Sequence, residues 1–187
     1  METDLNKLRD RAYLIAKSHG FHEKEESDET HLMLIITEIA EAVNADRKNH
    51  HANVKAFEHH IEYAKMHNVY SDDYFKSCFS YIDESVECEL SDVAIRLLDF
   101  AGARNTDFNI KIDPSFGVNI DSTFCENCFK ICRAITNPFF HNIREHIRCL
   151  LGDVFIISKM YNIDLFKFID LKMKYNELKP YKNGKEY

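Results

Sequence analysis

Residues that interrupt regular secondary structure are scarce in this chain. It holds 5 Gly and 3 Pro among 187 residues, whereas these two types together usually make up roughly 12% of a sequence. Sandwiches and barrels need such residues at their many turns, so a many-stranded β fold is strongly disfavoured. We therefore expect long helices. A chain of this length suits a single domain built around one sizeable core.

Hydrophobic periodicity divides the chain into segments of helical character. We predict helices over residues 4–19, 30–49, 52–67, 123–136, 142–161 and 163–178, with a further main helix inside 74–103. The 30–49 helix is apolar around most of its circumference, so it is expected to lie at the centre of an all-α bundle. The main helix inside 74–103 is expected to carry Ile82 on its apolar side.

Two segments differ in composition from the rest of the chain. Residues 48–78 hold five His and few strong hydrophobes, and we interpret them as an insert between two main helices. Residues 179–187 form a polar, basic tail. No Gly/Ser-rich linker separates these parts, which indicates one domain over residues 1–187.

The charge balance restricts the partners of the protein. Lys and Arg number 24 and Asp and Glu 31, a formal net charge of −7, which argues against sequence-independent binding of duplex nucleic acid. A phosphorylated substrate stays compatible, because a metal ion inverts the local charge. No apolar run reaches the ~18 residues of a membrane span, and the N-terminus lacks the apolar region of a secretory signal. The six Cys are expected to be reduced thiols of a cytoplasmic protein.

Two pairs of acidic residues stand out from the remaining charges. Glu38 and Glu41 lie three apart in the most apolar helix, and Glu89 and Asp92 lie three apart in another. Residues at this spacing share a helix face, so antiparallel packing of the two helices would bring four carboxylates together. Their mutual repulsion requires cations, and oxygen ligands select Mg²⁺, with Mn²⁺ as a substitute. The alternative is a set of exposed charges paired with Lys or Arg, which the apolar neighbours of Glu38 disfavour.

In this arrangement the chain resembles the MazG-like, all-α nucleoside triphosphate pyrophosphohydrolases. The two carboxylate pairs resemble the signature of that family, and their surroundings, 31–42 and 89–102, are similar to its two motif helices. Residues 172–185 resemble a C-terminal Lys/Tyr-Asn segment found in a subset of it. The 42–88 span between the pairs is longer than is usual there, and the chain has no Trp, which some relatives place around the base.

The resemblance implies an activity and an assembly. The expected reaction is hydrolysis of a canonical or modified (deoxy)nucleoside triphosphate between its α- and β-phosphates, in nucleotide-pool cleansing or control, by a homodimer or homotetramer. Glu38, Glu41, Glu89 and Asp92 would hold the metal, and Glu38 or Glu41 would also orient the attacking water. Such a reaction needs no nucleophilic side chain, because phosphoryl transfer depends mainly on positioning and electrostatics.

Basic residues near these carboxylates are candidates for binding the polyphosphate. Arg96 follows Asp92 by one turn on the same helix face. With the resemblance, the C-terminal segment supplies further substrate-binding candidates: Lys172, Lys174, Tyr175, Asn176, Lys182 and Lys185. The alternative for this segment is a solvated helix end in which Lys is favoured by the helix dipole.

Other features are assigned to ordinary structural roles. Cys125, Cys128 and Cys132 lack the second ligand pair of a recognised zinc pattern, so we interpret them as buried thiols on one helix face. The paired histidines of the 48–78 insert are interpreted as surface decoration. The absence of a Gly-rich phosphate loop excludes a P-loop NTPase. The competing functional class is a non-catalytic helical dimerisation or interaction module with its acidic pairs on the surface.

Overall fold

The computed structural model describes residues 4–110, 117–137 and 142–184, and within these ranges it contains helices and no strand. The α-helices are α1 (Leu5–Ser18), α2 (Asp28–Arg47), α3 (Val54–Met66), α4 (Asp72–Phe79), α5 (Val86–Ala103), α6 (Phe124–Thr136), α7 (Ile143–Met160) and α8 (Leu165–Glu177). A 3₁₀ turn, η1 (Tyr181–Gly184), follows. The predicted all-α fold is confirmed. None of the described helices is long and apolar enough to cross a membrane.

Side-chain caps set where several helices begin. Ser27 and Ser85 each accept a hydrogen bond from the backbone three residues on, at the start of α2 and α5. Thr123 and Glu126 form a reciprocal capping box at the start of α6. Such side chains satisfy backbone N–H groups that have no partner within the helix, which stabilises the helix end by about 1 kcal/mol.

Residues 74–103, in which hydrophobic periodicity predicts one main helix, contain the end of one helix, a turn and a second helix. α4 ends at Phe79 and α5 begins at Val86. Between them Glu84 has a φ of 54°, in the left-handed region through which a right-handed helix cannot continue. Ile82 is buried, but in this turn and not on the helix as expected.

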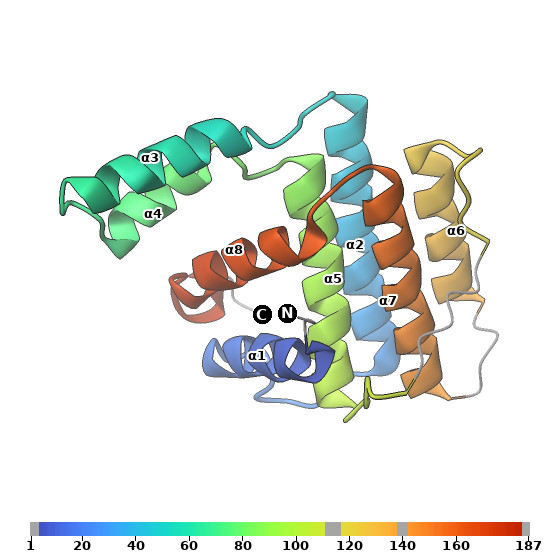
Figure 1. Ribbon diagram of the computed structural model, residues 1–187. Helices are drawn as coiled ribbons and strands as arrows, with labels where there is room; N and C mark the ends of the chain where they lie inside the picture. The colour runs from blue at the N-terminus through green and yellow to red at the C-terminus, as the bar shows by residue number, and fades with distance from the viewer. Residues whose placement is uncertain (1–3, 111–116, 138–141, 185–187) are drawn as a thin grey trace.

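The central helix is α5, not the 30–49 helix that was expected to take this place. α5 packs against α1, α2, α7 and α8, whereas α2 packs mainly against α5 and α6. α2, α5, α6 and α7 run roughly side by side, and α1 and α8 lie across one side of α5 (Figure 1). The outer face of α2 leaves Met33, Thr37 and Ala40 exposed. Apolar residues around a helix therefore did not suffice to bury its whole circumference.

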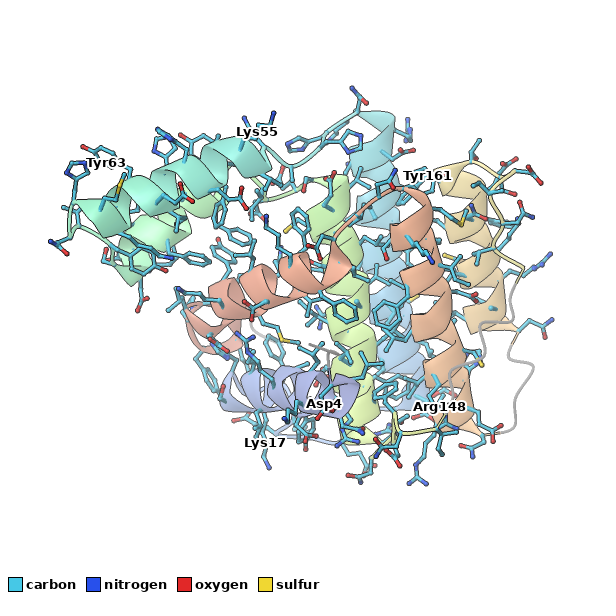
Figure 2. All side chains as sticks on the ribbon, viewed as in Figure 1. Asp4, Lys17, Lys55, Tyr63, Arg148 and Tyr161 are labelled. Atoms are coloured by element: carbon cyan, nitrogen blue, oxygen red, sulfur yellow. The ribbon has the colours of Figure 1, made fainter. Side chains whose placement is uncertain are left out.

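α3 and α4 occupy most of the 48–78 segment and lie side by side, extending away from the bundle (Figure 1). We call this pair the arm. It has a small core of its own, shared with α5 and α8, made of Phe57, Phe75, Cys78, Phe79, Ile82, Cys88 and Phe168. Tyr63 lies towards the outer end of α3 and is exposed (Figure 2). α4 packs against α8, so the arm is attached to the bundle through the last long helix.

In the described part of the chain, none of the six cysteines forms a disulfide. Cys128 is buried, as expected for the 125–132 group, but Cys125 is exposed and Cys132 is half-buried. The prediction of one buried thiol face is therefore wrong for Cys125, because it lies on the outer face of α6, whereas Phe124 and Cys128 face the bundle.

Candidate metal and phosphate site

A cavity of about 360 Å³ opens between α1, α2, α5 and α8. The side chains that concern its chemistry are charged and come mostly from α2, α5 and α8: Glu38, Glu41, Glu89, Asp92, Arg96, Lys172 and Lys179. Apolar residues of α1, among them Ala12, Ile15 and Ala16, form another wall. The cavity therefore combines a charged wall with an apolar one, which is typical of ligand pockets.

The carboxylates meet because α2 packs along α5 and their spacing keeps each pair on one helix face. One oxygen each from Glu38, Glu89 and Asp92 lies within 4.8 Å of the other two. Glu41 lines the same cavity but lies outside this close group, and its side chain is exposed. The structure thus brings three of the four predicted ligands into one group, which we call the acidic triad, and places the fourth at its edge.

Burial makes the charged forms of Glu89 and Asp92 unfavourable. Glu89 is 6% exposed, and burial, followed by the charge of Asp92, raises its pKa to about 8. Burial also raises the pKa of Asp92, an effect that the ammonium of Lys172 opposes. Crowded carboxylates with raised pKa values are more easily ionised when a cation is present, so the triad favours cation binding.

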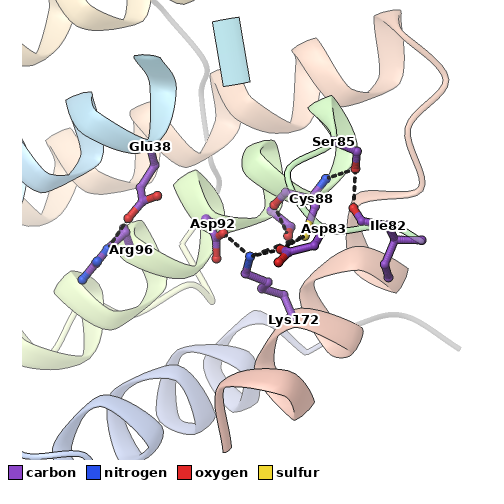
Figure 3. A network of polar contacts seen from close by, with 9 residues as sticks. Glu38, Ile82, Asp83, Ser85, Cys88, Asp92, Arg96 and Lys172 are labelled. Carbon is purple, nitrogen blue, oxygen red and sulfur yellow. Dashed lines mark hydrogen bonds and ion pairs between the residues drawn. The ribbon is translucent and has the colours of Figure 1, made fainter. Parts of the chain in front are cut away.

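Two basic side chains contact the triad, Arg96 at Glu38 and Lys172 at Asp92 (Figure 3). The Arg96 Nε donates to Glu38 Oε1 at 2.9 Å. The Lys172 Nζ lies 2.8 Å from Asp92 Oδ2 and 3.2 Å from Asp83 Oδ1. Burial by itself lowers the pKa of Lys172, but Asp92, Cys88 and Asp83 outweigh burial and raise it, so the side chain is a permanent ammonium.

The donor set fits a hard divalent cation. An octahedral Mg²⁺ shell with bonds of about 2.1 Å places its oxygens at most about 4.2 Å apart, and the triad oxygens all lie within 4.8 Å of one another. The three side chains end in carboxylates on two packed helices, so small rotations about their χ angles can adjust this spacing. Glu38, Glu89 and Asp92 could therefore hold a metal ion through oxygen ligands.

The predicted C-terminal residues divide between two faces of α8. Lys172 and Asn176 lie four apart and both line the cavity. The Asn176 Oδ1 is buried and has no hydrogen-bond partner in the described part of the chain. Tyr175 instead stacks on Phe79 of the arm, with ring centroids 4.1 Å apart.

Two further predicted substrate contacts lie away from the cavity. The Lys174 ammonium donates to Tyr70 and lies 4.4 Å from the centroid of the Phe75 ring, on the side of α8 that faces the arm. The Lys182 Nζ lies 3.3 Å from Glu23 Oε2. Lys185, also predicted, lies outside the described residues.

Sequence reasoning missed Asp83, a charged residue of the cavity. It lies in the turn before α5, where no helical spacing links it to Glu89. Asp99 also lines the cavity, and helical periodicity links it to the carboxylate pair, because it lies seven residues after Asp92 on the same face of α5. It accepts a hydrogen bond from His22 Nε2 at 2.7 Å. Lys179, which belongs to the basic C-terminal segment of the sequence, lies just after α8 and lines the cavity.

The histidines of the arm form ring contacts. His60 stacks on Tyr81 at 5.0 Å, and Tyr63 lies 4.3 Å from His67 between ring centroids. Among the described residues, the close group of three or more His, Cys, Asp or Glu side chains is the acidic triad. The arrangement agrees with the interpretation of these histidines as surface residues.

Comparison of the chain with protein-family models, with curated proteins and with solved structures found no match.

Proposed function

We propose that this protein is a Mg²⁺-dependent nucleoside triphosphate pyrophosphohydrolase, which converts a nucleoside triphosphate and water into a nucleoside monophosphate and pyrophosphate. The observation that supports the proposal best is the acidic triad of Glu38, Glu89 and Asp92, set in a cavity with Arg96 and Lys172 on its flanks. Carboxylates, a hard cation and nearby basic groups are the components that phosphoryl transfer uses.

The size of the cavity supports a nucleotide ligand. Its volume of about 360 Å³ lies within the range of small-molecule pockets. Glu89 and Asp99, which both line it, are ten residues apart on α5, a distance of about 15 Å along the helix axis. A triphosphate at the triad would leave the nucleoside near the apolar wall of α1.

In this proposal the triad and the two basic side chains beside it have different tasks. Glu38, Glu89 and Asp92 hold the cation. When bound, it neutralises charge on the phosphates and lowers the pKa of a water molecule beside it. Arg96 and Lys172 bind phosphate oxygens through N–H donors.

Glu41 and Asn176 complete the site. Glu41 lies at the exposed edge of the triad, where its carboxylate orients the attacking water and accepts a proton from it. The Asn176 Oδ1 has no protein donor in the described residues and accepts a hydrogen bond from the nucleoside.

The competing class, a non-catalytic interaction module, requires the acidic pairs to be surface charges. Glu89 is 6% exposed, and the side chain of Asp92 is 15% exposed. Burying such groups without a function for them would cost stability. The burial therefore favours an enzyme of the MazG-like kind, with the homodimer or homotetramer and the role in nucleotide-pool control that the resemblance implies.

The test is to incubate the purified protein with a panel of canonical and modified nucleoside triphosphates, with and without Mg²⁺, and to measure pyrophosphate release. We expect release from at least one substrate only when the cation is present. Glu41→Gln is expected to abolish release while the protein stays folded, and Glu62→Gln, at an exposed position of the arm, is the matched control. Release from no substrate contradicts the proposed activity, and an active Glu41→Gln contradicts the role of Glu41.

A further inference from the structure

Lys172 is buried beside the triad to an unusual degree for a lysine. Its side chain is 8% exposed. Its ammonium has three partners that accept hydrogen bonds, Asp92 Oδ2 at 2.8 Å, Asp83 Oδ1 at 3.2 Å and Cys88 Sγ at 3.5 Å (Figure 3), and it also lies 5.6 Å from the centroid of the Phe79 ring. An ammonium has three donors, so each is used within the protein. Lys172 is therefore held in place before any ligand arrives.

One of these partners, Asp92, also belongs to the triad. An ammonium and a divalent cation that share one carboxylate repel each other, and the repulsion is strong where burial lowers the effective dielectric constant. Asp83 lies outside the triad and already contacts the ammonium. The ammonium can therefore give up Asp92 and keep a carboxylate partner without a large movement.

We propose that Lys172 is a built-in counter-ion that neutralises Asp92 in the metal-free protein, so that a divalent cation binds in competition with it and displaces it towards Asp83. This inference rests on the proposed function, since it takes the triad as the metal site. The resident ammonium keeps the metal-free cleft from accumulating uncompensated buried charge. It also weakens metal binding in the absence of substrate.

The competition links the metal to the polyphosphate. Phosphate oxygens offer the displaced ammonium new acceptors, so a bound polyphosphate removes part of the cost of metal binding. By thermodynamic linkage the metal then raises the affinity for polyphosphate by the same factor. Pyrophosphate, which carries the same phosphate groups without a nucleoside, is a suitable probe of this coupling.

The experiment measures Mn²⁺ binding to metal-free protein by isothermal titration calorimetry, without substrate turnover. Lys172→Met, which removes the ammonium and keeps most of the apolar stem, is expected to bind Mn²⁺ at least tenfold more tightly than the unmodified protein. Lys174→Met is the matched control, because Lys174 lies on the other face of α8 against Tyr70 and Phe75. Its Mn²⁺ affinity is expected to stay within threefold of the unmodified protein.

A thermal measurement and a second variant complete the test. Metal-free Lys172→Met is expected to melt below the unmodified protein and to gain more in Tm on saturation with Mn²⁺. If Lys172→Met does not fold, Lys172→Gln replaces it in the test. The Gln variant removes the charge but keeps hydrogen-bonding capacity, and it is expected to show the same gain in Mn²⁺ affinity. Pyrophosphate is expected to tighten Mn²⁺ binding to the unmodified protein more than to the folded Lys172 variant.

The outcomes separate the two levels of the proposal. Mn²⁺ affinity that is unchanged or weaker in a folded Lys172 variant overturns the counter-ion role and leaves the proposed function standing. Failure of the unmodified protein and of the folded Lys172 variant to bind Mn²⁺ overturns the triad as a metal site, and the proposed function with it.

Discussion

The cavity between α1, α2, α5 and α8, called the cleft below, and the arm formed by α3 and α4 bury opposite kinds of side chain. Glu89 and Lys172 are buried at the cleft, whereas the arm buries aromatic residues such as Phe57, Phe75 and Phe79. Aromatic burial stabilises a fold directly, while buried carboxylates cost free energy unless they are paired or bind a ligand. The contrast supports the proposal that the cavity has a chemical task, whereas the burial in the arm is of the kind that stabilises a fold.

The two regions are nevertheless connected through α8. On its inner face, Lys172 contacts Asp92 of the triad. On its outer face, the Tyr175 ring stacks on Phe79 and the Lys174 ammonium lies over the Phe75 ring. The arm therefore supports the helix that carries the counter-ion. Substitutions at the cleft and in the arm should affect different measurements, which allows the comparison to be tested.

The largest effect is expected at the cleft. Asp92→Asn should lower kcat/KM for pyrophosphate release by at least about 10³-fold, equivalent to about 4 kcal/mol, because Asn is a poor ligand for a hard cation. The fold should be kept, since the amide can still form a hydrogen bond. Asp73→Asn is the control, because Asp73 is exposed on the arm and paired with Lys76. An Asp92→Asn variant with full activity would remove the distinction between cleft and arm.

A somewhat smaller effect, and one on stability, is expected in the arm. Phe79 is 1% exposed and stacks on Tyr175, so Phe79→Ala should lower the free energy of unfolding by about 3 to 4 kcal/mol, as measured in urea. Tyr63→Ala, at an exposed position of α3, should change it by less than about 0.5 kcal/mol. Equal losses in both variants would show that the arm lacks the core assigned to it.

A pH effect of lesser size is expected at His31, which stacks on Phe100 with ring centroids 4.5 Å apart. Burial lowers its pKa below the usual value of 6.5. The unfolded chain therefore takes up this proton first as the pH falls, and the stability present above pH 6.5 is lost as the pH falls through the folded-state pKa. His31→Phe should reduce the loss of stability between pH 7 and 5 in chemical denaturation, and an unchanged loss would place the titrating group elsewhere.

The smallest effect is expected at the exposed histidines. His50→Ala and His59→Ala, alone or combined, should change the free energy of unfolding by less than about 0.5 kcal/mol, because both side chains are exposed. Calorimetric affinity for Mn²⁺ should also stay the same. A marked drop in that affinity would move the metal site from the cleft to these histidines.

Local spacing determined which acidic residues share a face, and tertiary packing determined which of them meet. Glu89 and Asp92 could be paired from the sequence because a helix has a fixed period. The exclusion of Glu41 from the triad depends on the line along which α2 contacts α5. Asp83 joined the cavity from a turn, where no period applies.

The C-terminal segment illustrates the same limit. Its residues were predicted together as substrate contacts. In the structure Lys172 and Asn176 of α8 line the cavity, whereas Lys174 and Tyr175 of the same helix contact the arm. Their four-residue spacing shows that Lys172 and Asn176 share a face. It does not show which face meets the triad, because that depends on the path of the chain through α7 and the turn before α8.

The scarcity of Gly and Pro, the helical periodicity and the two carboxylate pairs determined an all-α fold with acidic residues grouped on two helices. These properties are local, since backbone geometry fixes them within a few residues. The central place of α5, the arm and the contact of Lys172 with Asp92 and Asp83 were decided only by the tertiary structure. They join residues up to 89 positions apart, and such contacts depend on how all the apolar faces are buried at once.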